Sequence, residues 1–386
     1  MDQAAESRDD LRTTPLTSWH QAAGARMVPF AGFLMPVQYE SVLAEHAAVR
    51  ERVGLFDITH MGEIAVSGPG AEAWLDGLVT NRVAGIAPGK VVYTPMCRAD
   101  GVVLDDMLVY RLDAERWYVV CNASNHAKIA GRLTERRPTA GVQVRDVSDA
   151  TALVAVQGPE SRELLRRLSA LADVQERIDG LDFYTAFMTV PHGAEWIVSR
   201  TGYTGEHGYE LYVPGADAPA LWEELLERGG DLGVAPVGLA ARDTLRFELA
   251  YCLYGHELDE QTTPLEAGIA WAVKLKKGDF VGREALAAQK AAGVPRRLVG
   301  LEVAGRAIAR QGAPVLAAGR EVGRVTSGTF SPTLQQSLAL ALVAADAPVG
   351  EIEVEVRGKR LSCTLRSLPF VTARVKGDPR AERTLP

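Results

Sequence analysis

One strand-like segment, residues 101–110, constrains the fold of this chain more than any other. Its sequence, GVVLDDMLVY, is an apolar run interrupted only by Asp105 and Asp106. Such a run, preceded by a turn signal, indicates a buried β-strand. Because successive side chains of a strand point to opposite faces, at least one of the two aspartates must enter the interior. A buried carboxylate needs a partner or a chemical role.

The residues before this strand predict how it is paired. The dipeptide Asp100-Gly101 is a typical signal for a type I′ hairpin between two strands. In that register Tyr93 and Asp106 are diagonal neighbours on one face, and Asp105 points to the other face. A slip by one residue would exchange the two aspartates. The inward aspartate is then either a core residue satisfied by backbone amides or a group with a role in chemistry.

A second segment, residues 200–211, combines glycines with a carboxylate at the start of a strand. Its sequence, RTGYTGEHGYEL, places three glycines between two strand-like segments, which indicates a glycine-rich hairpin loop. Glycines allow a flat ligand to approach the backbone, and Glu210 can accept hydrogen bonds from paired N–H donors of a heterocycle. The spacing matches neither a phosphate-binding loop nor a dinucleotide fingerprint, so a tight turn with a solvated Glu210 is the alternative.

The size and composition of the chain bound its class. Its 386 residues exceed the size at which a single core usually stops growing, so we expect two or three domains. A net charge of -7 without a basic cluster argues against nucleic acid as the main ligand. Four scattered cysteines without metal-binding spacing fit a reducing compartment, and we expect no metal site. No apolar run is long enough for a membrane span, and the polar N-terminus lacks targeting features, so we expect a cytoplasmic protein.

The alternation of patterns predicts a mixed α+β chain. Helical periodicity recurs between strand-like segments, and the strands cluster as meanders, which favours antiparallel sheets. From residue 296 onward, short β runs separated by Gly, Pro and Ser predict a small β-barrel or sandwich. We expect a disordered tail at 1–13, an α+β region at 14–290, a β domain at 291–375 and a frayed tail at 376–386.

Further blocks follow one another in a fixed order along nearly the whole chain. They are TPLTSWHQAAGARMVPFAGFLMPVQY at 14–39, VGLFDITHMGE at 53–63, QGP at 157–159, GLAARDTLRFE at 238–248 and TSGTFSPTL at 326–334. Together with the two segments above, they resemble the aminomethyltransferase of the glycine cleavage system, the T-protein family. The resemblance implies a three-lobed cloverleaf of two interleaved α+β lobes around a folate channel, with a C-terminal antiparallel β-barrel.

The resemblance also implies a reaction that belongs to glycine catabolism. Members of this family move the methylene of an aminomethyl group, carried on the lipoyl arm of H-protein, to tetrahydrofolate. The products are 5,10-methylenetetrahydrofolate, ammonia and dihydrolipoyl H-protein. We therefore expect a tetrahydrofolate-dependent one-carbon transferase whose partner is lipoylated H-protein.

The family motif assigns roles to single residues of this chain. Its acting residue is the second aspartate of the pair, which falls on Asp106 and agrees with the predicted hairpin register. A carboxylate in an apolar strand is a better proton acceptor, because desolvation disfavours its charged form. We expect Asp106 to orient the folate N10 region, take up a proton and stabilise iminium character without forming a covalent intermediate.

Several other positions are implied to contact folate. Glu210 matches the acceptor for the pterin N–H donors, and Asn122 matches a second pterin contact. Arg242 matches a folate-contacting arginine, although its pattern alone favours a surface ion pair. The segment PFVTARVKG at 369–377 departs from the usual basic tail motif of the family. The remaining expected contacts are Tyr93, Tyr251, Trp271 and Arg374.

Two other functions stay open from the sequence. A folate-binding iron–sulfur maturation factor shares the cloverleaf and is recognised by a K-G-C-Y-x-G-Q-E block. The matching stretch here, KGDFVGRE at 277–284, has Asp279 in place of the cysteine. A tetrahydrofolate-dependent demethylase would keep the folate site and change the donor pocket, and it would turn over without a lipoyl carrier.

Overall fold

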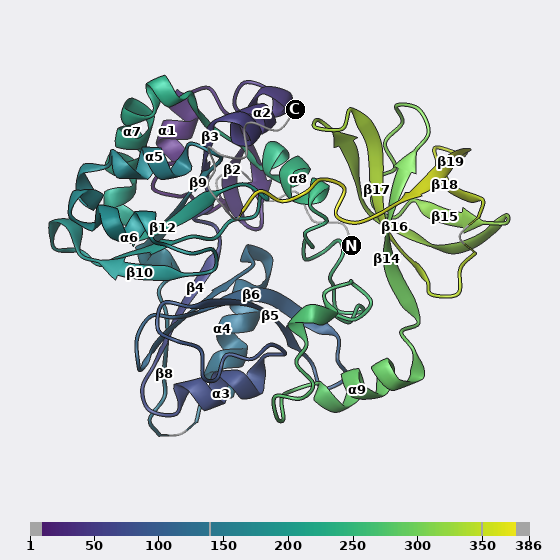
Figure 1. The fold of residues 1–386 in the computed structure, drawn as a ribbon, viewed down its shortest axis with the longest axis horizontal. Helices are drawn as coiled ribbons and strands as arrows, with labels where there is room; N and C mark the ends of the chain where they lie inside the picture. Colours follow the sequence, from purple (N-terminus) through teal and green to yellow (C-terminus); the bar gives the residue numbers. More distant parts are fainter. Residues whose placement is uncertain (1–9, 139, 349, 376–386) are drawn as a thin grey trace.

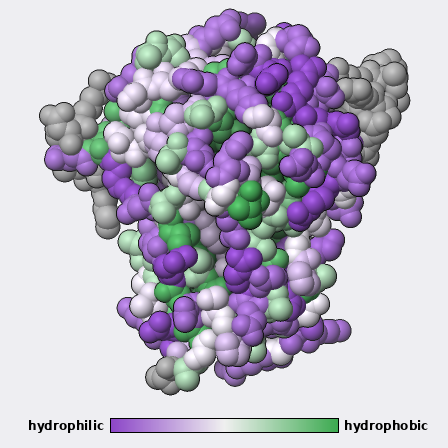
Figure 2. All heavy atoms as spheres, turned by 90° about the vertical axis from the view of Figure 1, so that its left-hand side faces the viewer, coloured by the Kyte–Doolittle hydropathy of each residue, from purple (hydrophilic) through white to green (hydrophobic). Residues whose placement is uncertain are grey.

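The computed structural model describes residues 10–138, 140–348 and 350–375. Figure 1 shows three lobes, two of mixed α+β structure and one β-barrel. Within the described residues, no helix is long and apolar enough to cross a membrane. On the face shown in Figure 2, hydrophilic side chains cover much of the surface and apolar ones are scattered among them.

The first lobe contains a six-stranded sheet in the order β10-β11-β12-β9-β3-β13. Its strands are β3 (Val53–Asp57), β9 (Thr151–Gln157), β10 (Ala186–Thr189), β11 (Trp196–Ser199), β12 (Gly208–Pro214) and β13 (Val234–Pro236). Its helices are α1 (Thr17–Ala22), α2 (Val42–Glu51), α5 (Ser161–Arg166), α6 (Gln175–Asp179), α7 (Ala218–Arg228) and α8 (Leu239–Glu248). A hairpin of β1 (Arg26–Phe30) and β2 (Phe33–Gln38) lies between α1 and α2 in the sequence.

The second lobe contains a five-stranded sheet in the order β5-β6-β7-β4-β8. Its strands are β4 (Gly62–Ser67), β5 (Val91–Cys97), β6 (Val103–Arg111), β7 (Arg116–Cys121) and β8 (Gln143–Asp146), with helices α3 (Ala71–Leu78) and α4 (His126–Glu135). The chain enters this sheet after β3 and returns to the first sheet at β9, so the two lobes are interleaved in the sequence.

Strand β9 explains why the two α+β lobes hold together. Its sequence, TALVAVQ, is apolar along its length because both of its faces are covered. Val154 and Val156 lie in a core shared with Trp222 of α7, whereas Ala155 on the other face lies in a core shared with Tyr110 of the second sheet. The interface between the lobes is therefore a hydrophobic core in its own right.

The C-terminal lobe is a closed antiparallel barrel in the order β14-β17-β16-β15-β18-β19. Its strands are β14 (Arg296–Val303), β15 (Pro314–Ala317), β16 (Arg320–Ser331), β17 (Gln336–Ala344), β18 (Ile352–Val356) and β19 (Lys359–Arg366). Helix α9 (Arg283–Ala292) precedes it, so the expected domain boundary at 290/291 falls within the last turn of this helix. The barrel closes its own strand edges, which leaves fewer unpaired backbone groups than an open sheet has.

The two expected tails lie mostly outside the described residues. Residues 1–9 and 376–386 are not described. The last part of the expected N-terminal tail is folded onto the protein, since Leu11 is buried and Arg12 forms a bridge with Phe33.

The hairpin of β5 and β6 has the expected register but a different turn. Pro95 pairs with Asp106, as expected. The turn is not a two-residue type I′ turn, because the backbone N–H of Arg98 donates to the Val102 carbonyl at 2.9 Å around a three-residue loop. Gly101 ends this loop with a φ of 85°, a left-handed conformation that glycine adopts readily. A bulge on β6 offsets the extra turn residue and restores the register toward Asp106.

Candidate active site

The carboxyl group of Asp106 lies in a polar setting built by three adjacent strands. Its Oδ2 accepts a hydrogen bond of 2.9 Å from the hydroxyl of Tyr93, the diagonal neighbour on β5. Its Oδ1 accepts one of 2.8 Å from the Asn122 side-chain amide, which follows directly after β7. The hairpin register alone therefore places Tyr93 beside the carboxyl group, and the neighbouring strand supplies the second donor.

Asp105 points to the opposite face and is held by a different set of donors. It accepts bonds from the Asn122 backbone N–H at 2.9 Å and from the Asn125 side-chain amide at 2.6 Å. The Asn122 side-chain amide also donates to Asp105 at 2.8 Å, so one amide joins both carboxyl groups. Asp105 is fully buried and accepts from three donors, so it fits the description of a satisfied core aspartate, whereas Asp106 is only partly buried.

The two carboxyl groups have raised pKa values. Burial raises the pKa of Asp106 to about 6, against the lowering effect of the hydrogen bonds from Tyr93 and Asn122. Burial and the nearby charge of Asp106 raise the pKa of Asp105 to about 7. A carboxyl group that titrates near neutral pH can both accept and release a proton under working conditions. Asp106 is therefore the candidate for proton transfer.

Two stacked pairs of aromatic side chains lie near Asp106. Tyr93 stacks on Trp271 with ring centroids 5.4 Å apart, and Trp271 is 57% exposed. Tyr203 stacks on Tyr251 with centroids 5.8 Å apart. Flat parallel pairs of this kind are suited to line a channel for a flat heterocycle. The stacked pairs bring together three of the expected contacts and one residue, Tyr203, that the sequence analysis did not select.

Glu210 lies on β12 at the other end of this region and is buried. Thr201 donates a hydrogen bond to its Oε2. Burial raises the pKa of Glu210, while the Thr201 bond and the positive charge of Arg242 oppose this effect. The Arg242 guanidinium lies over the Tyr203 ring, 4.8 Å from its centroid. The pair of Glu210 and Arg242 offers a hydrogen-bond acceptor and a cation to one ligand.

Tyr184 connects the two ends of the site. Burial raises the pKa of its phenol, and the nearby Tyr251, Glu210 and Asp106 raise it further. Its backbone has a φ of 61°, which is strained for a bulky residue. The chain holds this conformation with a hydrogen bond from its N–H to Arg200 O at 3.0 Å.

Comparisons with known proteins decide the family. A model described as GCVT N-terminal domain matches residues 16–277, and one described as Glycine cleavage T-protein C-terminal barrel domain matches residues 296–372. The chain belongs to the glycine cleavage T-protein family.

Individual relatives agree. The aminomethyltransferase of Halothermothrix orenii is 45% identical over 363 residues, covering 94% of this chain and 100% of the relative. That of Moorella thermoacetica is 48% identical over 365 residues, covering 94% and 98%. The crystal structure of glycine cleavage system aminomethyltransferase T from Bartonella henselae matches with a TM-score of 0.86 and 36% identity over 95% of this chain and 99% of that one. The expected family, fold class and transferase function are confirmed.

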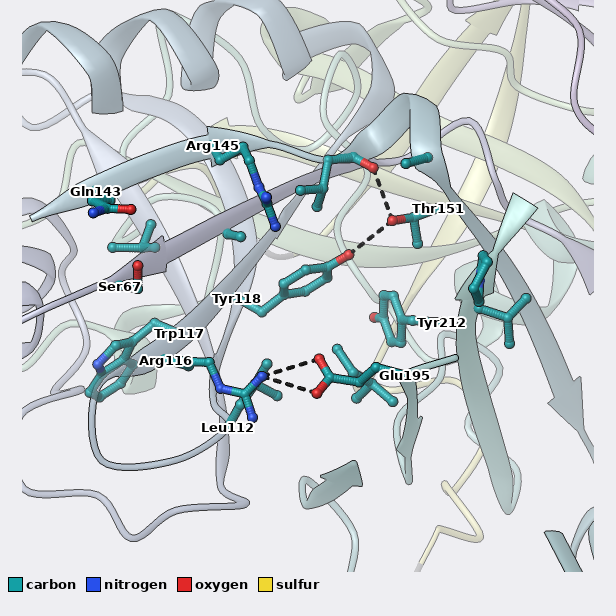
Figure 3. A pocket seen from close by; sticks show the side chains of 17 residues that line it. Ser67, Leu112, Arg116, Trp117, Tyr118, Gln143, Arg145, Thr151, Glu195 and Tyr212 are labelled. Atoms are coloured by element: carbon teal, nitrogen blue, oxygen red, sulfur yellow. Dashed lines mark hydrogen bonds and ion pairs between the residues drawn. The ribbon is translucent and has the colours of Figure 1, made fainter. Parts of the chain in front are cut away.

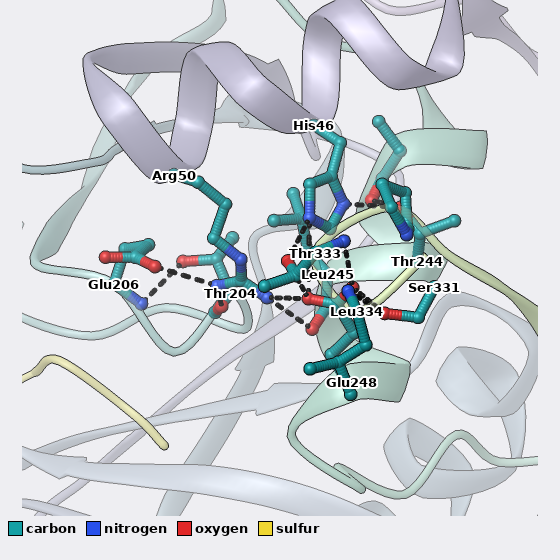
Figure 4. Close-up of polar contacts among 12 residues, drawn as sticks. His46, Arg50, Thr204, Glu206, Thr244, Leu245, Glu248, Ser331, Thr333 and Leu334 are labelled. Carbon is teal, nitrogen blue, oxygen red and sulfur yellow. Dashed lines mark hydrogen bonds and ion pairs between the residues drawn. The ribbon is translucent and has the colours of Figure 1, made fainter. Parts of the chain in front are cut away.

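Within this T-protein fold, Arg374 takes part in a network of ion pairs. Its guanidinium donates to Glu206 Oε1 and to the Arg50 carbonyl, each at 2.7 Å. Arg50 in turn bonds Glu206 at 2.9 Å and Glu248 at 2.8 Å. Figure 4 shows that this network joins α2 and α8 to the loop before β12, and that Ser331 of the barrel reaches Glu248. Arg374 therefore fastens the C-terminal segment to the first lobe.

The glycines of the 200–211 loop also have a different role from the expected one. A Cβ atom at Gly202 or Gly208 would lie within 2.3 Å of the Gln157 side chain. Gln157 Nε2 donates to Thr201 O at 3.1 Å, and its Oε1 accepts from Thr204 at 2.8 Å. These glycines make room for a buried glutamine that ties the loop together, and no ligand is needed to explain them.

Three residues of the site were missed by sequence reasoning. Thr201 and Tyr203 lie within a segment that had been singled out, where only the glycines and Glu210 carried a recognisable pattern. Tyr184 lies in a stretch without any motif, and its strained backbone has no sequence signal because glycine or asparagine would normally mark a positive φ.

Proposed function

We propose that this chain transfers the methylene of an aminomethyl group on lipoylated H-protein to tetrahydrofolate, with Asp106 as the catalytic residue. The observation that carries the proposal is the position of one partly buried carboxyl group, with a pKa of about 6, between Tyr93 and Asn122. It faces the region that is also lined by Tyr184 and Glu210. The family is folate-dependent in general, which supports a folate in this region.

Asp106 is suited to the proton and charge movements of the reaction. Protonation of the amine and release of ammonia leave a cationic carbon that is stabilised by the lipoyl sulfur, and an ionised carboxylate in a partly buried site stabilises this charge. Bond formation from a folate nitrogen to that carbon releases a proton, and a carboxylate with a pKa of about 6 accepts it. Breakage of the carbon–sulfur bond then leaves a thiolate and a folate iminium ion, and the thiolate takes up the proton held by Asp106. Attack of the second folate nitrogen on the iminium carbon closes the methylene bridge and releases a proton, which balances the proton taken up by the departing amine.

The other end of the site binds the pterin. The carboxylate of Glu210 accepts from the ring N–H and the amino group, and Arg242 stabilises this charge. Asn122 donates its amide protons to the two aspartates, so its Oδ1 is the atom that it offers to a ligand donor. Tyr93, Tyr251 and Trp271 then pack on the flat parts of the folate.

The donor arrives on a protein, and we place the reaction in the cytoplasm. A lipoyl arm is long and flexible, so only its end must reach Asp106 while H-protein stays outside. The scattered cysteines, of which Cys97, Cys121 and Cys252 are buried, support a reducing compartment.

The test uses purified protein with tetrahydrofolate and aminomethyl-loaded H-protein. We expect equimolar ammonia and methylenetetrahydrofolate, both dependent on the carrier. Turnover of a small methylated donor without the carrier would favour a demethylase. Folate binding without either product would favour a non-catalytic folate protein, and absence of folate binding would remove the site assignment.

A further inference from the structure

Four hydroxyl groups connect Glu210 to the interface between the two α+β lobes. Thr201 Oγ1 donates to Glu210 Oε2. Ser199 Oγ lies 2.8 Å and Tyr110 Oη 3.3 Å from Thr201 Oγ1. Tyr110 Oη lies 2.8 Å from Tyr212 Oη. All five side chains are buried, and none of the residues is more than 7% exposed.

The chemistry of the groups fixes the direction of these hydrogen bonds. An ionised carboxylate only accepts, so Thr201 must give its single hydroxyl proton to Glu210. Thr201 then accepts from Ser199 and Tyr110. Tyr110, having given its proton, accepts from Tyr212 and also from Ser199, whose hydroxyl is shared between Thr201 and Tyr110. The protons of Tyr212, Tyr110 and Thr201 therefore follow one another toward Glu210, and each bond polarises the next one.

The members of this chain come from both lobes. Ser199 ends β11, Thr201 follows it, and Tyr212 lies on β12 of the first lobe, whereas Tyr110 lies on β6 of the second lobe. Tyr212 also lines a pocket between the two sheets (Figure 3). The orientation of the Glu210 carboxylate thus depends on a residue of the sheet that carries Asp106.

We propose that Thr201, Ser199, Tyr110 and Tyr212 act as positioning residues that hold the Glu210 carboxylate in one orientation for a heterocycle with paired N–H donors. The inference rests on the proposed function, in which that heterocycle is the pterin. It adds that folate affinity depends on hydroxyl groups that do not touch the ligand. A carboxylate restrained in this way is organised before the ligand arrives, which lowers the entropy lost on binding.

The test removes one hydroxyl at a time and measures both tetrahydrofolate affinity and turnover. For Thr201→Val we expect the Kd to rise about tenfold, since a hydrogen bond to a charged group is lost. For Tyr110→Phe we expect a rise of about threefold, and for Tyr212→Phe a smaller one of about 1.5-fold, because the polarising effect weakens along the chain. KM for folate should follow Kd, while kcat at saturating folate stays within about twofold. Thr201→Ser, which keeps the hydroxyl, should restore affinity.

A matched control is present in the same aromatic cluster. Tyr118 packs edge-on against Tyr110 and Tyr212, with ring centroids 6.5 Å and 5.7 Å away. Its hydroxyl bonds to Thr151 Oγ1 at 3.3 Å and not to the chain that leads to Glu210 (Figure 3). Tyr118→Phe should therefore leave folate affinity unchanged while causing a similar small change in packing.

The outcomes separate this inference from the proposed function. Equal losses in Tyr118→Phe and Tyr110→Phe would assign the effect to packing and overturn the inference. Normal affinity in both Thr201→Val and Tyr110→Phe would overturn it as well, provided that Glu210→Gln weakens binding. Normal affinity in Glu210→Gln would instead overturn the pterin assignment itself. Should Thr201→Val fail to fold, Thr201→Ala and the two Tyr→Phe variants carry the same test.

Discussion

Asp106, which is partly buried, and Glu210, which is buried, are both carboxyl groups with raised pKa values, but the chain supports them in different ways. Asp106 receives its donors from Tyr93 and Asn122, which lie on the strand partner and at the end of the next strand of the same sheet. Glu210 depends on Thr201, on a cation from α8 and on the hydroxyl group of Tyr110 from the other lobe. The surroundings of Asp106 therefore come from neighbouring strands of one sheet, whereas those of Glu210 come from distant parts of the chain.

The charges around the two groups differ in the same way. The negative charge of Glu257 raises the pKa of Asp106, and Asp106 in turn raises the pKa of Asp105, because like charges disfavour the ionised form. The nearby cation Arg242 favours the ionised form of Glu210. Asp106 is therefore placed to exchange a proton, and Glu210 to keep its charge and bind.

The largest expected effect comes from neutralising the first of these groups. Asp106→Asn keeps the shape of the side chain but removes the proton acceptor, so kcat should fall about a thousandfold. Folate affinity, measured by direct binding, should change by less than about threefold because Glu210 is untouched. Asp100→Asn is the control, since Asp100 lies exposed in the turn of the same hairpin and pairs with Arg98. If Asp106→Asn turns over near the wild-type rate, Asp106 is not the catalytic carboxylate.

The next effect is on stability and concerns Asp105. Its folded pKa of about 7 lies above the unfolded value near 3.8, so the folded state binds more protons between these pH values. Stability should therefore fall as pH rises from about 4 to about 7. Relative to Asp105→Asn, the wild type should lose on the order of 3 kcal/mol of unfolding free energy over this range. Urea unfolding at several pH values measures the difference, and parallel curves for the two proteins would contradict the raised pKa.

Neutralising the second carboxylate should affect binding more than chemistry. Glu210→Gln replaces an acceptor by an amide that presents N–H groups to the pterin donors, so the Kd for tetrahydrofolate should rise about thirtyfold. The kcat at saturating folate should change much less than in Asp106→Asn. Glu195→Gln is a suitable control, because Glu195 pairs with Arg116 at the surface before β11. A fall in kcat as large as that of Asp106→Asn would show that Glu210 is needed for the chemical step as well as for binding.

The contrast also explains what the sequence could predict. The register that joins Tyr93 to Asp106 followed from the alternation of a strand and a turn signal, although the turn was one residue longer than expected and a bulge restored the pairing. The hydroxyl chain behind Glu210 could not be predicted, because Tyr110 and Tyr212 read as ordinary apolar strand residues. The contact between their hydroxyl groups depends on how the two sheets pack against each other, and a local sequence pattern does not predict that packing. Arg374 was expected to contact folate, and in the structure its guanidinium pairs with Glu206. A local pattern does not predict this ion pair either.

The smallest expected effect concerns Trp271, the exposed aromatic residue next to Tyr93 and Asp106. Trp271 stacks on Tyr93 while more than half of its surface is exposed. Trp271→Ala removes one aromatic contact from the folate channel and one from Tyr93, so KM for folate should rise about threefold to fivefold. Trp271→Phe, which keeps a smaller ring, should show less than half of this rise. The more informative readout is kcat: if Tyr93 needs its stacking partner to hold the hydroxyl on Asp106, kcat falls together with affinity in Trp271→Ala. A change in KM alone would mean that the hairpin register is sufficient to position Tyr93, as its short distance to Asp106 indicates.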